Sequence, residues 1–347
     1  MSNELISIII PCKNEENYIA NTLDSIIEGD FPFENLEVFV VDGMSDDNTQ
    51  EILQKYMQKY SQIHIINNPQ QTVPYAMNYG IEAAKGNTIV RLDAHSIYPK
   101  NYIAELVKYL NKLDADNVGG VWDTMPANSS LEAQAIAYAS SHPFGIGNAQ
   151  YRISNKVEPY EVDTVPFGCY KKEVFEKIGL YDTDLTRNQD DELNARLLQN
   201  NGKIFLIPSL KIKYFARDKF SKMFKMFYQY GYFKPLVNMK LLKPATLRQF
   251  VPVVFVLFLL LGALLSLFVS GASYIFGAGL VFYFIVNMIV SFLIAKNQKN
   301  LMLIPYLMYT FFLIHLSYGL GYLMGIVDFM ILKKHMKKNS NKIKISR

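Results

Sequence analysis

The sequence contains few cysteines, since Cys12 and Cys169 are the only two in 347 residues. Two thiols cannot form a disulfide framework and are too few for a structural zinc site, so we expect a reducing compartment. Glycine and proline are also modest in number, at 19 and 14, while 50% of the residues are hydrophobic. This composition excludes collagen-like, low-complexity and disordered chains. The N-terminus lacks a basic segment before a longer apolar stretch, so we expect no signal peptide.

Acidic residues are nearly absent after residue 210 of the chain. Residues 1–210 hold 29 acidic residues against 16 basic ones, whereas residues 211–248 hold ten basic residues and one acid. Only three charged residues occur in 249–332, and residues 333–347 have seven basic residues and no acid. This is not the pattern of a nucleic-acid binder. It predicts a soluble domain tethered to a membrane: residues 1–210 form the domain, followed by a basic amphipathic segment on anionic headgroups, a transmembrane region and a basic tail.

Three apolar stretches, over residues 250–269, 274–295 and 301–327, supply the transmembrane region. Each is long enough to cross a hydrocarbon core of about 30 Å. Three crossings from a cytoplasmic domain would place the basic tail outside, against the positive-inside tendency. The alternative is that one stretch is re-entrant or lies flat on the membrane.

Short apolar runs alternate with helical patterns over the first part of the chain. We expect strands at residues 5–10, 36–43, 63–68 and 87–95, and helices at 15–29, 46–60 and 74–86, the last closed by Gly86. This alternation predicts a parallel sheet with helices on its faces. Such sheets bind ligands at the carboxyl ends of their strands.

Polar residues follow the first two predicted strands. Residues 11–16 read PCKNEE, and residues 42–49 read DGMSDDNT. Carboxylates at the ends of adjacent parallel strands suit a ribose diol or a base edge, because they accept hydrogen bonds from hydroxyl and N–H groups. The alternative for the second run is a helix N-cap at Ser45 or Asp46.

Asp93 and His95 follow the fourth predicted strand. Residues at i and i+2 share a face, so both side chains can face one site. A carboxylate with an imidazole suits Mn²⁺ or Mg²⁺, which also takes oxygens from a diphosphate. The alternative is a turn aspartate beside a surface histidine.

A third polar run, RNQDDELNAR, covers residues 187–196. Adjacent acids repel one another, and burial would raise the pKa of one of them toward that of a working base. The alternative is a helix N-terminus, where acids interact favourably with the helix dipole. Arg187 and Arg196 are candidate partners for these acids or for a phosphate.

The order and spacing of these runs resemble family 2 of the glycosyltransferases, which have the GT-A fold. The resemblance covers residues 5–235 and is densest at SIIIPCKNEENYI, VDGMSDDNT, RLDAH, VDTVPFGCYKKEVFEKIGLYD and RNQDDELNAR. The last two runs and the apolar C-terminus resemble the branch of the ExoA-type succinoglycan glucosyltransferases. The resemblance implies an α/β, Rossmann-like catalytic domain with a mostly parallel sheet, followed by transmembrane helices.

The resemblance also implies roles for residues of this chain. Those in nucleotide-sugar-binding positions are Pro11, Asn14, Glu15, Asp42 and Asp93. Asp93 and His95 occupy the place of the family's DxD motif, which holds Mn²⁺ or Mg²⁺ and the donor diphosphate. Asp190 matches the general base, and its neighbour Asp191 is the rival.

Acceptor-side roles are implied for Lys171, Lys172, Arg187 and Gln229. Processive members of the family carry a QxxRW motif in this region. The run from Gln229 to Phe233 has the Gln but no Arg-Trp, which favours transfer of a single sugar.

The expected function is inverting transfer of one sugar, from a UDP-hexose, to a polyprenyl-diphosphate-linked glycan at the inner (plasma) membrane, with the catalytic domain in the cytoplasm. Copies of the chain could associate through the apolar segments. The enzymatic alternative is a polyprenyl-phosphate sugar synthase. A sugar-phosphate nucleotidyltransferase would need a Gly-rich, basic loop after the first strand, and PCKNEEN is neither. A non-catalytic membrane adaptor would not need these acidic residues together.

Overall fold

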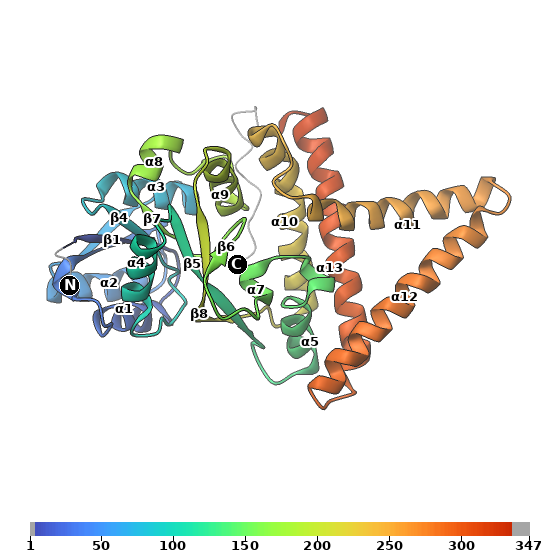
Figure 1. The fold of residues 1–347 in the computed structure, drawn as a ribbon, viewed down its shortest axis with the longest axis horizontal. Coiled ribbons are helices and arrows are strands. Elements are labelled where there is room, and N and C mark those ends of the chain that lie inside the picture. The colour runs from blue at the N-terminus through green and yellow to red at the C-terminus, as the bar shows by residue number, and fades with distance from the viewer. Residues whose placement is uncertain (1–3, 335–347) are drawn as a thin grey trace. The chain divides into compact units, whose positions relative to one another are not determined.

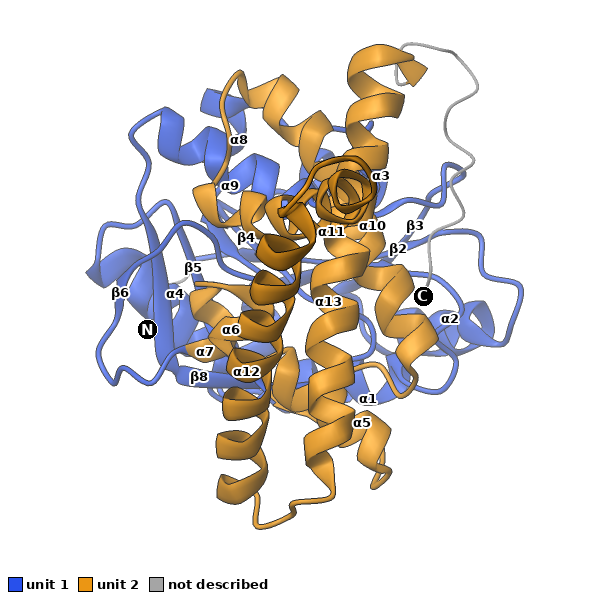
Figure 2. Ribbon diagram, turned by 90° about the vertical axis from the view of Figure 1, so that its right-hand side faces the viewer, with its two compact units in different colours: residues 1–123, 154–214 blue, residues 124–153, 215–347 orange. Residues whose placement is uncertain are grey.

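The computed structural model describes residues 4–334 of the chain. It divides into two compact units, which Figure 2 colours separately. Unit 1 consists of residues 1–123 and 154–214, and unit 2 of residues 124–153 and 215–347. Residues 124–153 thus group with the C-terminal helices. Most of the predicted basic tail, at 335–347, lies outside the described residues.

Unit 1 is built on an eight-stranded sheet with the strand order β3-β2-β1-β4-β7-β5-β8-β6. The strands are β1 (Ile6–Cys12), β2 (Leu36–Asp42), β3 (Ile63–Asn67), β4 (Thr88–Arg91), β5 (Asn117–Met125), β6 (Tyr160–Glu161), β7 (Cys169–Lys171) and β8 (Ile204–Phe215). Strands β3, β2, β1 and β4 run parallel to one another, as the sequence predicts. β7 then runs antiparallel to both β4 and β5.

The helices of unit 1 connect these strands (Figure 1). They are α1 (Ile19–Ile27), η1 (Phe33–Asn35), α2 (Thr49–Lys59), α3 (Val73–Ala83), α4 (Tyr102–Lys112), α8 (Glu173–Ile178) and α9 (Gln189–Gln199). Branched apolar side chains fill the central strands β1 and β2, which are buried over nearly their whole length. They form one core with the apolar faces of α1 and α4.

Two boundaries differ from the sequence prediction. Helix α3 ends at Ala83, so Gly86 does not close it. Gly86 is instead required by a close approach, because a Cβ there would lie 2.4 Å from the carbonyl oxygen of Leu5. Strand β4 ends at Arg91, two residues before Asp93, because its backbone then turns into the loop that precedes α4.

Register brings the strand ends to one edge of the sheet. Asp42 lies opposite Cys12 of β1 and Asn67 of β3. Arg91 lies opposite Ile9, and the amide of the next residue, Leu92, donates to the carbonyl of Ile9 at 3.0 Å. The loops that follow β1, β2 and β4 therefore leave the sheet at the same edge.

Unit 2 is helical. Its elements are α5 (Leu131–Ala139), α6 (Pro143–Ile146), α7 (Gln150–Ile153), α10 (Phe220–Leu241), η2 (Leu247–Phe250), α11 (Val251–Phe268), α12 (Ala272–Asn297), α13 (Leu303–Gly325) and η3 (Ile326–Ile331). Between α5 and α7 lies the short helix α6, a single turn. Three helices, over 247–268, 272–297 and 303–331, are long and apolar enough to cross a membrane.

Helices α10 and α13 approach closely through glycines. A Cβ on Gly231 would lie 2.0 Å from the carbonyl oxygen of Tyr318, and one on Gly321 would lie 2.1 Å from that of Tyr228. Gly325 repeats the contact one turn later, at 2.2 Å from the carbonyl oxygen of Tyr232. Glycines spaced by four residues present a groove into which a second helix backbone fits. This contact therefore fixes α13 against α10.

We expect Gly321→Ala to destabilise unit 2, because the new methyl group overlaps the backbone of α10. Overpacking of this kind costs about 1–3 kcal/mol. The measurement is the thermal unfolding midpoint of the full chain in detergent. Gly277→Ala in α12 is the matched control, since no atom lies within 4 Å of its Cβ position. An equal midpoint for the two variants would contradict the close-packing account.

Candidate active site

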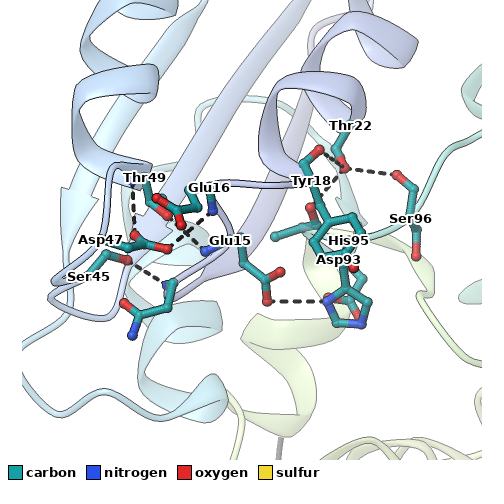
Figure 3. A network of polar contacts seen from close by, with 12 residues as sticks. Glu15, Glu16, Tyr18, Thr22, Ser45, Asp47, Thr49, Asp93, His95 and Ser96 are labelled. Carbon is teal, nitrogen blue, oxygen red and sulfur yellow. Dashed lines mark hydrogen bonds and ion pairs between the residues drawn. The ribbon is translucent and has the colours of Figure 1, made fainter. Parts of the chain in front are cut away.

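The loops after β1 and β2 are joined by hydrogen bonds (Figure 3). Asn14 adopts a positive φ of 55°, and its amide donates to Ser45 Oγ at 2.8 Å. Its side chain both donates to Asp46 Oδ1 at 2.7 Å and accepts from the Asp46 amide at 3.1 Å. Asparagine tolerates the left-handed conformation better than most residues. The predicted cap residues therefore stabilise the contact between the two loops.

Helix α1 and helix α2 begin from this contact. The Glu15 amide donates to Thr49 Oγ1 at 2.8 Å, and the Glu16 amide donates to Asp47 Oδ2 at 3.3 Å. In return, Glu16 Oε2 accepts from the Asn48 amide at 3.1 Å. These bonds hold the backbone of Glu15, whose carboxylate points away from α2 and toward His95 in Figure 3.

Asp42 is fully buried at the end of β2. Its carboxylate accepts hydrogen bonds from Ser45 Oγ at 2.5 Å, from the Ser45 amide at 3.1 Å and from Gln50 Nε2 at 2.7 Å. An ionised carboxylate offers about four acceptor sites. Three of them are used within the protein, which leaves capacity for one more donor.

The loop after β4 is held from two sides. The amide of Asp93 donates to the Tyr98 hydroxyl at 2.6 Å. The buried hydroxyl of Thr22, on α1, lies 2.9 Å from the carbonyl oxygens of both Ala94 and Ser96. Because α1 also begins beside Glu15, this bond links the loop after β1 to the loop that carries Asp93 and His95.

Three side chains converge at this loop. His95 Nδ1 lies 3.3 Å from Glu15 Oε1 and 3.4 Å from Asp93 Oδ1. The exposed fractions of these side chains are 14% for Glu15, 29% for Asp93 and 49% for His95. The spacing of Asp93 and His95 therefore does bring the two side chains to one site. The carboxylate of Glu15 lies at the same site.

The donor set suits a divalent cation that is shared with a substrate. Within residues 4–334, no cluster of three or more His, Cys, Asp or Glu residues has the arrangement of a complete metal cage. Mg²⁺ and similar cations are commonly held by one or two carboxylates together with substrate phosphates and water. Asp93 and His95, which are partly exposed, fit that mode of binding.

Arg91 and Asp190 form an ion pair between Arg91 Nη1 and Asp190 Oδ1. Arg91 is the last residue of β4, and Asp190 lies in the first turn of α9. The Arg91 side chain is 10% exposed and that of Asp190 is 29% exposed, so the carboxylate is recessed but can be reached. Burial raises the pKa of Asp190; the Arg91 charge opposes the shift, whereas Asp191 and Asp93 add to it.

Buried polar contacts fix α9 behind this pair. Asn194, one turn after Asp190, accepts from Asn117 Nδ2 at 2.8 Å and donates to Thr164 Oγ1 at 2.8 Å. Glu192 and Arg196 form a two-point ion pair with both distances at 2.8 Å. Arg196 is thus engaged within unit 1, where it also donates to the Leu180 carbonyl at 2.8 Å.

The structure does not bring all predicted residues together. Lys171 and Lys172 lie beside the start of β4, at the opposite edge of the sheet from Asp93. Lys171 pairs with Asp114 at 2.7 Å, and Lys172 Nζ donates to the Ala84 carbonyl at 2.6 Å. We therefore leave both lysines out of the acceptor site, because their places in the sheet are set by these contacts.

Three further predicted residues lie in a strand, a loop and a helix. Pro11 is the residue before the last in β1 and lies opposite Val41. Arg187 lies in the loop that precedes α9. Gln229 is buried in α10 and belongs to unit 2.

Some residues of the site were given no role by the sequence analysis. Gln50, Thr22 and Asn194 support the predicted side chains from neighbouring helices, and nothing in the sequence distinguishes them from other polar helix residues. Arg91 did carry a signal, because it is the one charged residue in the otherwise apolar strand TIVR. A buried charge of this kind requires a partner.

Comparison with known proteins identifies the family of the chain. Residues 7–179, about half of the chain, match the model of the family described as Glycosyl transferase family 2. A dolichyl N-acetyl-alpha-D-glucosaminyl phosphate 3-beta-D-2,3-diacetamido-2,3-dideoxy-beta-D-glucuronosyltransferase of Methanococcus voltae is 29% identical over 243 residues, which are 68% of this chain and 74% of that protein. The succinoglycan biosynthesis protein ExoA of Rhizobium meliloti is 27% identical over 257 residues, or 72% and 76% of the two chains.

A solved structure shares the fold. The mannosyltransferase PcManGT from Pyrobaculum calidifontis, in complex with GDP-Man and Mn²⁺, superposes with a TM-score of 0.61 at 17% identity, over 93% of this chain and 88% of that one. The chain therefore belongs to glycosyltransferase family 2, with a GT-A-like domain and C-terminal helices that are apolar enough to cross a membrane.

Proposed function

We propose that this glycosyltransferase moves one sugar, with inversion, from a nucleotide-sugar donor to a polyprenyl-diphosphate-linked glycan. The observation that carries the proposal is the convergence of Glu15, Asp93 and His95 at the edge of the sheet where Arg91 holds Asp190. A donor site and a recessed base are thereby adjacent on one sheet edge. Inverting transfer needs the base beside the acceptor hydroxyl that attacks the anomeric carbon of the bound donor.

The loops after β1 and β2 hold the nucleoside in this proposal. Asp42 has capacity for one further donor, which suits a base N–H or a ribose hydroxyl. The family resemblance assigns Glu15 to the ribose or base as well. Pro11 and Asn14 shape the loop between them. A UDP-hexose is the donor that the family resemblance favours.

Asp93 and His95 hold a divalent cation, Mn²⁺ or Mg²⁺, together with the donor diphosphate. When bound, such a cation supplies positive charge that stabilises the departing diphosphate. Asp93 provides a carboxylate oxygen and His95 a ring nitrogen, both partly exposed. Thr22 and Tyr98 keep their loop in place without contacting the ligand themselves.

Asp190 acts as the general base. Its carboxylate takes the proton of the acceptor hydroxyl while that oxygen bonds to the anomeric carbon and the bond from that carbon to the diphosphate oxygen breaks. Arg91 orients the carboxylate, and its charge lowers the pKa of Asp190 against the effect of burial. Asp191 stands next to it in the first turn of α9 and is the alternative base.

The acceptor is a lipid-linked glycan in the plasma membrane, with unit 1 in the cytoplasm. The name of the Methanococcus voltae relative specifies a dolichyl-phosphate-linked sugar as its acceptor. The basic residues over 211–248 suit anionic lipid phosphates at a membrane surface. A polyprenyl-phosphate sugar synthase differs in one testable respect, because its acceptor is the lipid phosphate itself.

The acceptor class is tested with the purified chain in detergent, a saturating nucleotide-sugar and two acceptors. We expect a glycosylated polyprenyl diphosphate to be extended by one sugar and polyprenyl phosphate to remain unmodified, as followed by mass spectrometry. The reverse result would identify a polyprenyl-phosphate sugar synthase, and addition of many sugars would contradict single transfer.

Replacement of the base separates the two candidate aspartates. We expect Asp190→Asn to lower kcat by about 10²–10⁴-fold, because general-base help is lost, while the Kd for the donor stays unchanged. The matched control is Asp191→Asn, which retains most of the activity. Turnover and donor binding by calorimetry give the two readouts. If Asp191→Asn is the inactive variant, the base assignment is wrong.

The pH dependence of kcat tests the Arg91–Asp190 pair. Because burial raises the pKa of Asp190, activity should fall on the acidic side at a pH above the ordinary value for aspartate of about 3.9. Removing the Arg91 charge raises the pKa further, so Arg91→Met should move this limb to higher pH. Arg91→Lys retains the charge and should restore part of the shift. An unmoved limb in Arg91→Met would contradict the proposed role.

A further inference from the structure

We infer that α11 and α12 cross the membrane, whereas α13 does not cross it and lies along the membrane surface. Two crossings return the chain to the side from which it entered. The inference concerns unit 2 alone and is independent of the catalytic roles proposed above. The three apolar helices look similar in the sequence, but they differ in how much of each is buried in the protein.

The three apolar helices are buried to different extents within the protein. In their most apolar windows, 11% of the residues of the first helix and 17% of those of the second are buried, against 50% for the third. The first helix is also the most apolar of the three and the third the least. α11 and α12 therefore expose apolar side chains almost all round, as membrane-spanning helices do, and α13 does not.

Helix α10 accompanies α13 along most of its length. Phe220 packs on Tyr309 near the start of both helices, Gly231 meets the Tyr318 backbone, and Tyr232 donates to Asp328 at 2.8 Å just beyond α13. The contacts advance along both helices in the same direction. If α13 entered the hydrocarbon core, α10 would have to enter with it.

Helix α10 is poorly suited to the hydrocarbon core. It carries Lys222 and Lys225, which are exposed, and the buried Lys234 and Gln229. A lysine at the centre of a bilayer costs about 2.5–3.5 kcal/mol even on insertion scales that give low values. The lysines of α10 instead suit the headgroup region, where α10 and α13 can lie together.

The middle of α13 also contacts backbone that is not part of a long helix. His315 Nε2 donates to the Phe144 carbonyl at 2.7 Å, and the Phe144 and Phe311 rings lie 5.0 Å apart. Phe144 belongs to α6, a single turn followed by Gly147 at a φ of +62° and by the exposed Asn148. Lipid-exposed irregular backbone does not occur within the hydrocarbon region.

The outer face of α13 and η3 is an apolar stripe. Its exposed members recur every three or four residues at each end of the helix: Tyr306, Tyr309, Met324, Val327, Met330 and Ile331. One apolar face with the opposite face packed on protein is the arrangement of a helix lying in the membrane interface. Tyrosines at such a face suit the headgroup level.

Helices α11 and α12 have a different course. A Cβ on Gly262 would lie 2.4 Å from the ring of Phe276, so the two helices pack together near their connection. From there they diverge and reach α13 at different points, α11 near Gly319 and α12 near Met308 (Figure 1). The pair forms a hairpin whose connection, at 269–271, lies away from α13.

Two crossings agree with the distribution of charge. The connection at 269–271 has no charged residue. Lys296 and Lys299 lie at the end of α12 and just after it, and Lys333 and Lys334 follow η3. With two crossings, all four lysines and the basic segment at 211–248 lie on the same side, as the positive-inside tendency requires.

Single-cysteine labelling tests this topology in the full chain. Both native cysteines are buried, so the wild type gives the baseline. Exposed reporters are Gln54→Cys in unit 1, Ser270→Cys in the hairpin connection, Gln298→Cys between α12 and α13, and Lys333→Cys after η3. A membrane-impermeant maleimide is added to intact spheroplasts and, separately, to permeabilised ones.

We expect Ser270→Cys to label in intact spheroplasts and the other three reporters to label only after permeabilisation. Labelling of Lys333→Cys in intact spheroplasts, with Gln54→Cys protected, would overturn the inference in favour of three crossings. Protection of Ser270→Cys in both preparations would overturn the crossing of α11 and α12. Neither result depends on donor, acceptor or catalysis, so the proposed function is tested separately.

Discussion

The ion pair between Arg91 and Asp190 is the interaction on which the candidate active site depends. It joins the end of β4, the last strand of the parallel part of the sheet, to the first turn of α9. Removing one partner of a buried pair leaves an uncompensated charge, which destabilises a protein by about 3–5 kcal/mol. The pair therefore holds the first turn of α9 at this edge of the sheet, and the Arg91 charge opposes the rise in the pKa of Asp190 that burial causes.

The remaining acids of the site are arranged around that pair. Asp42 accepts hydrogen bonds from Ser45 and Gln50, whereas Asp93 and Glu15 converge on His95. Carboxylates close together repel unless a cation lies between them. One cation, Arg91, belongs to the protein, and we propose that the other arrives with the donor diphosphate. We propose that the same sheet edge binds a strongly negative ligand and holds a base.

The sequence predicted the parallel sheet and the convergence of the strand ends, because both follow from alternating apolar runs and from register. It did not predict Gly86 correctly, since a close approach to Leu5 depends on a strand far away in the chain. Arg91 and Asn194 were missed for the same reason: their partners, Asp190 and Asn117, are 99 and 77 residues distant. The position of Lys171 beside the start of β4 could not be predicted either, because it depends on the antiparallel pairing of β7 with β4. Long-range pairing, and not local pattern, decides these positions.

The apolar helices illustrate the same limit, since hydropathy alone makes α13 similar to α11 and α12, and only its packing on α10 distinguishes it.

The central claim is that the edge of the sheet binds a nucleotide-sugar with a divalent cation. Nucleotide release by the purified chain, offered UDP-, GDP- and dTDP-sugars with Mn²⁺, with Mg²⁺ or with a chelator, tests it most directly. The account predicts metal-dependent release from one donor, lost in Asp93→Ala. Absence of both release and binding with every donor would contradict it.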